Sequence, residues 1–296
     1  YFQILVSENM PSNLPANTLI INEFSKIQNL LGQEFETILF DARKGIHLEA
    51  LAIAGGTLKM NGSLILLLSN WEELHSKIDK DSLRWSGSFE AIATPRFMTY
   101  FKHCIHKYGF PILYHQNYLK FNRTFQQPFV NHNATLDQQK IIEQILRKES
   151  EIYFLTAKRG RGKSALAGLL TNQLDTKIYL TAPNKSAVKI LAEFSQKEII
   201  FIAPDELFLA LQNDPSFSEN VWLFVDEAAM LPIAQLSAFS HHFKHILFTT
   251  TIHSYEGTGR GFELKFKQKI NRTFSDFELI EPLRWSKDDA LEAFID

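Results

Sequence analysis

A basic, glycine-rich segment carries the residue types that bind phosphate. It reads Ala157-Lys-Arg-Gly-Arg-Gly-Lys-Ser164, follows an apolar run and precedes a stretch of helix-forming residues. Gly160 and Gly162 allow backbone N–H groups to turn toward phosphate oxygens, and the N-terminus of the following helix supplies partial positive charge. We therefore predict a P-loop in which alanine replaces the usual first glycine. The competing interpretation is a basic turn without a ligand.

An acidic pair follows a second apolar run, as it does in the second motif of helicase nucleotide sites. The run Val221 to Val225 ends in Asp226-Glu227. In a P-loop site, Lys163 reaches the β- and γ-phosphates, and Ser164 and Asp226 hold Mg²⁺. Glu227 then serves as general base toward the attacking water. The alternative for the acidic pair is a solvated helix N-cap.

Three weaker features fit the same ATP site, and each has a simpler alternative. Gln138 lies where helicase-like proteins place a glutamine that reads adenine, or it merely begins a surface helix. Thr181 to Asn184 resembles a segment that contacts a nucleic-acid backbone, or it is a turn and helix cap. Arg284 offers a guanidinium to the γ-phosphate, or it forms a surface ion pair. The predicted catalytic residues are Lys163, Asp226, Glu227 and Arg284.

Apolar runs and helix-length segments alternate along the second part of the chain. The expected strands are Ile152 to Thr156, Ile178 to Thr181, Ile199 to Ile202, Val221 to Val225 and His245 to Thr249. The expected helices are Ser164 to Leu174, Ala187 to Phe194 and Ile233 to Phe243. This pattern predicts an α/β fold of the RecA-like P-loop type, a parallel sheet with helices on both faces.

The first part of the chain predicts a smaller α/β domain. Its expected strands are Thr18 to Ile21, Thr37 to Phe40, Ser63 to Leu68 and Pro111 to Tyr114. A polar, irregular segment from Phe121 to Ala134 fits a linker, so the expected domains are residues 1–133 and 134–296. Tyr1-Phe2-Gln3 is not used to predict structure, because these residues could be either the remnant of a cleaved expression tag or native sequence. Asp41, Arg43 and Arg84 are assigned no chemistry.

Bulk properties exclude several classes of protein. The 31 basic and 33 acidic residues give a net charge of −2, so binding to nucleic acid would depend on local patches. The one cysteine, Cys104, forms no internal disulfide, and the longest apolar run, Leu64 to Leu68, is far shorter than a membrane span. We expect a cytoplasmic protein.

Several longer segments resemble the tRNA(Met) cytidine acetyltransferase family of bacteria. Two of these segments are the most specific. The first extends from Thr249 through Gly257-Thr-Gly-Arg-Gly261 to Phe266, and the second is Glu281-Pro-Leu-Arg-Trp-Ser286. The P-loop and the segments Phe40 to Arg43, Gly56 to Lys59 and Asp81 to Ser86 extend the resemblance over nearly the whole chain. It implies ATP contacts at Gln138, Gly160, Arg161, Gly162, Lys163, Ser164, Ala165, Leu166, Ala167 and Arg284.

The resemblance also implies an activity, partners and missing parts. Members of this family use acetyl-CoA and ATP to acetylate the wobble cytidine of elongator tRNA(Met). Their acetyltransferase domain and tRNA-binding tail would follow Asp296, so we expect no acetyl-CoA site within this sequence. The leading hypothesis is the ATPase portion of such an enzyme, with ATP use coupled to tRNA presentation. The alternatives are a nucleotide-binding interaction module without hydrolysis and a truncated, stand-alone RNA-dependent ATPase or motor.

The loop Gly257 to Gly261 has two interpretations of its own. Its glycines permit close backbone approach and Arg260 adds a charge, which suits contact with RNA or phosphate. A tight packing loop fits equally well.

Overall fold

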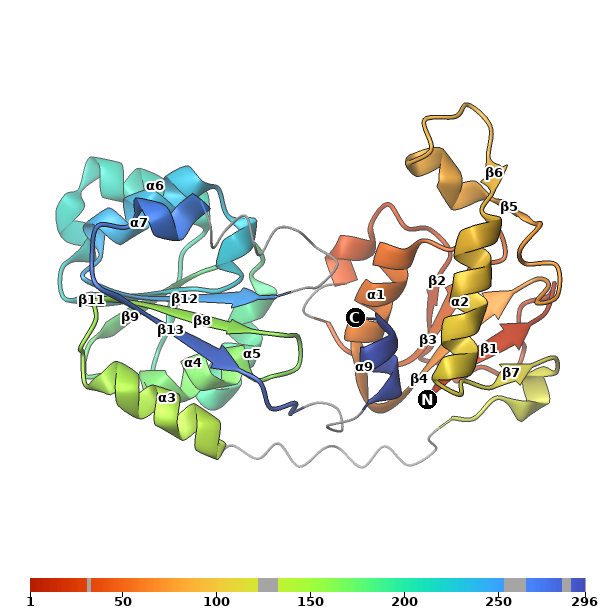
Figure 1. The fold of residues 1–296 in the computed structure, drawn as a ribbon. Helices are drawn as coiled ribbons and strands as arrows, with labels where there is room; N and C mark the ends of the chain where they lie inside the picture. The colour runs from red at the N-terminus through yellow and green to blue at the C-terminus, as the bar shows by residue number, and fades with distance from the viewer. Residues whose placement is uncertain (31–32, 122–132, 253–264, 284–288, 296) are drawn as a thin grey trace. The chain divides into compact units, whose positions relative to one another are not determined.

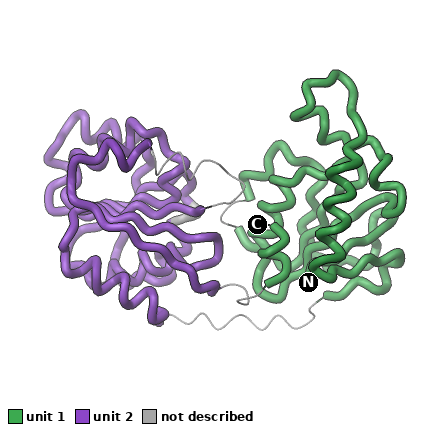
Figure 2. The backbone as a smooth tube through the Cα atoms, viewed as in Figure 1, with its two compact units in different colours: residues 1–129, 288–296 green, residues 130–287 purple. Residues whose placement is uncertain are grey.

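The computed structural model describes residues 1–30, 33–121, 133–252, 265–283 and 289–295, with all side chains in these ranges except those of 186 and 187. The chain forms two compact units (Figure 2). Unit 1 comprises Tyr1–Phe129 and Asp288–Asp296, and unit 2 comprises Val130–Lys287.

Unit 2 is built on a parallel sheet that contains all five predicted strands (Figure 1). Its strands are β8 (Ile152–Ala157), β9 (Lys177–Thr181), β10 (Ile200–Phe201), β11 (Val221–Val225), β12 (His245–Thr251) and β13 (Phe274–Leu279). They lie in the order β10-β9-β11-β12-β8-β13, and every pairing is parallel. Strand β12 therefore lies between β8, which leads into the glycine-rich loop, and β11, which leads into the acidic pair.

Helices cover both faces of the unit 2 sheet, as predicted. One face packs against α3 (Leu136–Leu146), α4 (Lys163–Thr171) and α5 (Ser186–Phe194), which bury residues such as Ile145, Leu166 and Leu191. The other packs against α6 (Pro204–Asn213) and α7 (Ile233–His242), through residues such as Leu207 and Phe239. The inner strands β9, β11, β12 and β8 are buried on both faces, which explains their continuous apolar runs.

Unit 1 is a second parallel sheet, and its order is β2-β3-β4-β1-β7. These strands are β1 (Phe2–Val6), β2 (Leu19–Ile21), β3 (Phe35–Asp41), β4 (Leu58–Leu68) and β7 (Ile112–Leu113). Strand β1 was not predicted, although it lies inside the sheet between β4 and β7. Phe2 and Gln3, which the sequence analysis set aside, are only 5% and 1% exposed.

The described helices of unit 1 pack against one face of this sheet. They are α1 (Leu48–Gly56), α2 (Pro95–Lys107) and α9 (Ala290–Ile295). The other face buries Leu5, Leu39, Ile65 and Leu67 with Leu119, which comes from an irregular segment. A short antiparallel pair, β5 (Ile78–Asp79) and β6 (Ile92–Ala93), lies outside the sheet.

The last described helix, α9, lies in a different unit from the one expected. We expected residues 134–296 to form one domain, but α9 belongs to unit 1. Phe294 packs edge-on or tilted against the rings of Phe2, Phe101 and Phe110, and Ile295 packs beside Gly55. Burial of these apolar side chains determines where the helix packs. The segment is too short for its apolar residues to show a periodic pattern in the sequence.

Six short 3-10 helices complete the described elements: Ile27–Leu30, Lys80–Arg84, Gln116–Tyr118, Pro215–Ser218, Ala228–Met230 and Lys267–Lys269. Among the described residues, no helix combines the length and apolarity that crossing a membrane requires.

Candidate nucleotide-binding site

The glycine-rich loop connects β8 to α4, as predicted. Gly160 and Gly162 have φ angles of 75° and 80°, in the left-handed region that glycine adopts without strain. A Cβ atom on Gly162 would lie 2.5 Å from Leu283 Cδ1 and 2.7 Å from Gln138 Nε2. The left-handed backbone conformation therefore favours glycine at position 162, and an added Cβ would also displace the ends of the Leu283 and Gln138 side chains.

Gln138 lies against this loop and braces it. Its side chain forms a capping box with Thr135 at the start of α3, and its Nε2 donates to the carbonyl oxygen of Gly162 at 3.1 Å. The residue is 2% exposed. The backbone N–H of Leu283 also donates to the carbonyl oxygen of Gly160, at 3.0 Å. The predicted adenine contact of Gln138 stays a prediction, whereas its bracing role was not foreseen.

Asp226 and Ser164 face each other across the site. Asp226 follows β11 and is 6% exposed, and its Oδ2 lies 3.5 Å from Ser164 Oγ in the first turn of α4. Its Oδ1 accepts hydrogen bonds from the hydroxyl of Thr249 and from the backbone N–H of Glu227. Because β8 and β11 flank β12, both residues come to the same edge of the sheet.

Glu227 and Lys163 meet through Thr251. Thr251 at the end of β12 donates its hydroxyl to Glu227 Oε1 at 2.5 Å and its backbone N–H to Oε2 at 3.1 Å. Lys163 Nζ donates to Thr251 Oγ1 at 2.8 Å and lies 4.0 Å from Glu227 Oε1. Glu227 itself adopts a left-handed backbone with φ of 50°, a conformation that non-glycine residues rarely occupy. Such outliers occur often at functional sites.

The two carboxylates have pKa values shifted in opposite directions. Burial raises the pKa of Asp226, and the neighbouring charge of Glu227 raises it further against the hydrogen bond from Thr249. Burial also pushes the pKa of Glu227 upward, but Lys163, the two hydrogen bonds from Thr251 and Arg159 together bring it below its ordinary value. Glu227 is therefore the more readily ionised member of the pair.

Thr249 and Thr251 are site residues that the sequence analysis did not assign. They belong to a segment whose resemblance was noted, but no role followed from the motif. The signal that locates them is topological: β12 ends between the loop and the acidic pair, so polar side chains at its carboxyl end contact both.

The oxygen atoms of Ser164 and Asp226 suit a magnesium ion. Mg²⁺ takes oxygen ligands at about 2.0–2.1 Å in octahedral geometry, which separates adjacent ligands by about 2.9 Å. The observed 3.5 Å between the two oxygen atoms fits one direct ligand and one water-mediated contact, or a small rotation of either side chain. The start of α4, with two left-handed glycines before it, fits a polyphosphate.

The remaining predicted ATP contacts lie in the loop and first turns of α4 or outside the described residues. Arg161 is 7% exposed, and Ala165, Leu166 and Ala167 are buried in α4, where they position the helix by packing. Thr181 is also buried, and its carbonyl oxygen accepts from the backbone N–H of Asp226 at 2.9 Å. Arg284 and the loop Gly257 to Gly261 lie outside the described residues.

The loop, the facing carboxylates and the intervening strand β12 define unit 2 as a P-loop domain of the RecA-like, helicase-related type. Family models give the particular assignment. Residues 154–296 match the helicase domain of RNA cytidine acetyltransferase NAT10/TcmA, and residues 3–116 match the N-terminal domain of tRNA(Met) cytidine acetyltransferase TmcA. The chain belongs to the tRNA(Met) cytidine acetyltransferase family, of which it carries these two domains.

Individual relatives agree with the family models. A tRNA(Met) cytidine acetyltransferase TmcA from Haemophilus influenzae is 61% identical over 99% of this chain and 45% of its own length. The protein of the same name from Haemophilus ducreyi is 38% identical over 99% of this chain and 50% of its own. The chain thus spans about half the length of these curated relatives.

Two solved helicases are more distant. The match to a structure of Pif1 helicases at forked DNA covers 53% of this chain and 46% of the helicase chain, with a TM-score of 0.38 and 15% sequence identity. The match to the UvsW helicase of bacteriophage T4 covers 67% of this chain and 86% of the helicase chain, with a TM-score of 0.38 and 10% sequence identity.

Proposed function

We propose that this chain is the ATP-binding and ATP-hydrolysing part of a tRNA(Met) wobble cytidine N4-acetyltransferase. ATP use by unit 2 would be coupled to presentation of the tRNA for acetylation. One observation carries the proposal: Lys163 and Ser164 at the start of α4 face Glu227 and Asp226, at 4.0 Å and 3.5 Å respectively. This arrangement brings a phosphate-binding loop and an acidic pair to one edge of a parallel sheet.

The residues divide the chemistry of hydrolysis among them. Backbone N–H groups around Gly160 and Gly162 bind phosphate oxygens, and Lys163 exchanges its bond to Thr251 for the β- and γ-phosphates. Ser164 and Asp226 would hold Mg²⁺, and the ion would supply positive charge beside the γ-phosphoryl group. Glu227, with its lowered pKa, is ionised and able to accept a proton from water.

The tRNA part of the proposal depends on the family rather than on a described contact. The relatives bear the name tRNA(Met) cytidine acetyltransferase, and one is 61% identical over 99% of this chain. So high an identity supports a shared nucleotide site and a shared role in the acetylation of tRNA.

A titration with adenine nucleotide in the presence of Mg²⁺ tests the proposal. We expect binding that Lys163→Ala abolishes. Lys189→Ala should leave binding intact, because that lysine is an exposed residue of α5 in the same unit. Equal affinities for the two variants, or none for the unaltered chain, would refute the nucleotide site.

A second candidate function is nucleotide binding without hydrolysis. The hydrogen bonds that Thr251 donates to both oxygens of Glu227 favour it, because they occupy the carboxylate that should activate water. Phosphate release with and without tRNA distinguishes the candidates. A chain that binds ATP but releases no phosphate under either condition supports the second.

A further inference from the structure

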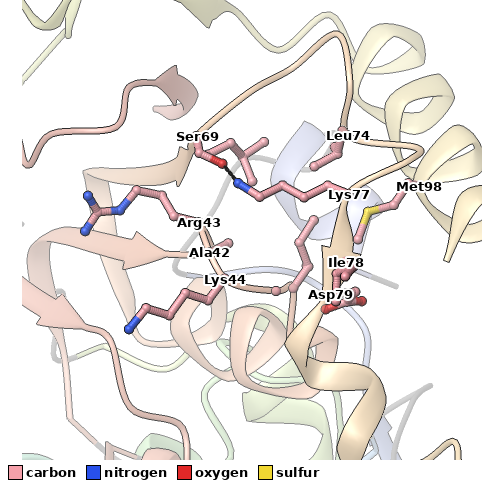
Figure 3. Close-up of a pocket in the computed structure, with 12 residues that line it drawn as sticks. Ala42, Arg43, Lys44, Ser69, Leu74, Lys77, Ile78, Asp79 and Met98 are labelled. Carbon is pink, nitrogen blue, oxygen red and sulfur yellow. Dashed lines mark hydrogen bonds between the residues drawn. The ribbon is translucent and has the colours of Figure 1, made fainter. Parts of the chain in front are cut away.

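Several cationic side chains have an acceptor within the protein. In unit 1, Lys77 donates to the hydroxyl of Ser69 (Figure 3). Arg43 forms an ion pair with Asp41, in which its Nη2 lies 2.6 Å from the carboxylate Oδ2. In unit 2, Arg272 donates to one carboxylate and to three backbone carbonyl oxygens. The donors of these side chains are therefore used within the fold.

Arg159, in the glycine-rich loop of unit 2, has no such acceptor. Its Nη1 atom is buried and bonds to none of the residues that the structure describes. Within the same described ranges, its guanidinium forms no ion pair. Most buried polar atoms of folded proteins are paired. Arg159 is therefore a cation whose donors remain for an anion that binds at the loop.

Two observations place Arg159 at the phosphate end of the site. It lies in the short loop between the end of β8 and the start of α4, next to the left-handed Gly160. Its positive charge is also one of the causes that lower the pKa of Glu227. The guanidinium thus lies within electrostatic reach of Glu227 without pairing with it, whereas Lys163 and Thr251 make the direct contacts of that carboxylate.

We propose that Arg159 donates its guanidinium to the γ-phosphate of ATP and stabilises the charge that this group carries during hydrolysis. The inference rests on the proposed function, because it takes a γ-phosphate to be the anion at this loop. An arginine supplied from the same chain or from a partner accelerates related reactions about 10³–10⁵-fold. The planar fork of a guanidinium matches two phosphate oxygens at once.

The reaction keeps Arg159 protonated throughout. Water attacks the γ-phosphorus and gives its proton to Glu227, while the bond from the γ-phosphorus to the bridging oxygen breaks. That oxygen keeps the electron pair and leaves as part of ADP. The sequence analysis expected the guanidinium from Arg284, which lies outside the described residues. Arg159, in contrast, belongs to the phosphate loop itself.

Affinities for a non-hydrolysable ATP analogue, adenylyl imidodiphosphate, and for ADP test the contact in the presence of Mg²⁺. Arg159→Ala should weaken binding of the analogue about tenfold or more, because it removes charged hydrogen bonds to the γ-phosphate. ADP, which lacks that group, should bind as tightly as it does to the unaltered chain. Arg147→Ala is the control, at an exposed arginine at the end of α3, and should change neither affinity.

Arg159→Lys separates the contact from the charge. Lysine keeps the positive charge but loses the fork, so phosphate release should slow while the acid limb of the pH–rate profile stays in place. Arg159→Ala should slow release and also move that limb to higher pH, because Glu227 loses one of the charges that lower its pKa. A role in the shape of the loop alone would not move the limb.

The ratio of the two affinities decides the outcome. A ratio that Arg159→Ala leaves unchanged, whether both affinities fall together or neither falls, would overturn the inference and leave the proposed function standing. If the unaltered chain binds neither nucleotide, the proposed function fails and the inference with it. If the chain binds both but releases no phosphate, hydrolysis is excluded, and a ratio reduced in Arg159→Ala still supports the contact with the γ-phosphate.

Discussion

The hydroxyl of Thr251 lies 2.8 Å from Nζ of Lys163 and joins this lysine to the acidic pair through Glu227. The same hydroxyl donates to Glu227, so it accepts from the cation and donates to the anion. One threonine at the end of β12 thus fixes the positions of the two groups that would act on a nucleotide. Its own orientation is set by the strand, since β12 pairs with both β8 and β11.

Thr251→Val should slow phosphate release by about tenfold or more. Valine has a similar shape but leaves Glu227 without the hydroxyl hydrogen bond that holds its carboxylate after Lys163 turns to the phosphates, and a bond to a charged group contributes about 1.5–3 kcal/mol. The measurement is steady-state phosphate release, with nucleotide affinity determined in parallel. Thr251→Ser retains the hydroxyl and should recover most of the rate; equal losses in the two variants would assign the effect to packing.

Gly162→Ala should destabilise unit 2 and weaken nucleotide binding. The left-handed conformation of residue 162 costs alanine about 1–2 kcal/mol, and the new Cβ would meet Leu283 Cδ1 at 2.5 Å. Gly109→Ala is the matched control, because Gly109 has a φ of 67° but nothing within 4 Å of its added Cβ. Urea unfolding of both variants separates conformational strain from steric overlap. A loss at position 162 no greater than that at position 109 would contradict the close packing.

Asp226→Asn should change how stability depends on pH. The raised pKa of Asp226 means that the folded state binds this proton more tightly than the unfolded state. Its contribution to the free energy of unfolding therefore falls as pH rises from about 3.9 through the raised value. Glu227 contributes in the opposite sense, because its pKa is lowered: its stabilisation is present above the ordinary glutamate pKa and is lost in acid.

Comparison of the two proteins by urea unfolding at several pH values isolates the Asp226 contribution. Asparagine can keep an oxygen for the bonds from Thr249 and from the Glu227 N–H. We expect the variant to gain stability relative to the unaltered chain as pH rises, and to lose Mg²⁺-dependent nucleotide affinity. Parallel pH profiles would show that Asp226 titrates normally.

Arg272→Ala should lower the free energy of unfolding by about 1.5–3 kcal/mol. Its guanidinium donates to carbonyl oxygens of Ser240, Phe243 and Lys244 at and after the end of α7, and to Glu151 at 2.8 Å. These carbonyl groups include some that a helix C-terminus leaves without partners. Thermal unfolding is the measurement, and Lys269→Ala, at an exposed position nearby in sequence, is the control. A change as small as that of the control would contradict this capping role.

Local sequence predicted the unit 2 strands because buried parallel strands must be apolar throughout. Four of the predicted strands, from Ile152 to Thr249, lie within one residue or two of their observed bounds, and β10 is shorter. Strand β13 was missed, since it lies at the sheet edge and only Leu279 is buried along it. In unit 1, β1 was missed because its first two residues, Phe2 and Gln3, were given no weight.

Sequence alone located the glycine-rich loop and the acidic pair, because glycine, lysine and carboxylate at this spacing are typical of a P-loop site. It also determined that both follow apolar strands. Only the tertiary structure decided that Thr249 and Thr251 hold those residues, that Gln138 braces the loop, and that α9 packs in unit 1. These contacts join positions far apart in the chain. The order of the strands determines which of these positions meet, and no local sequence pattern encodes that order.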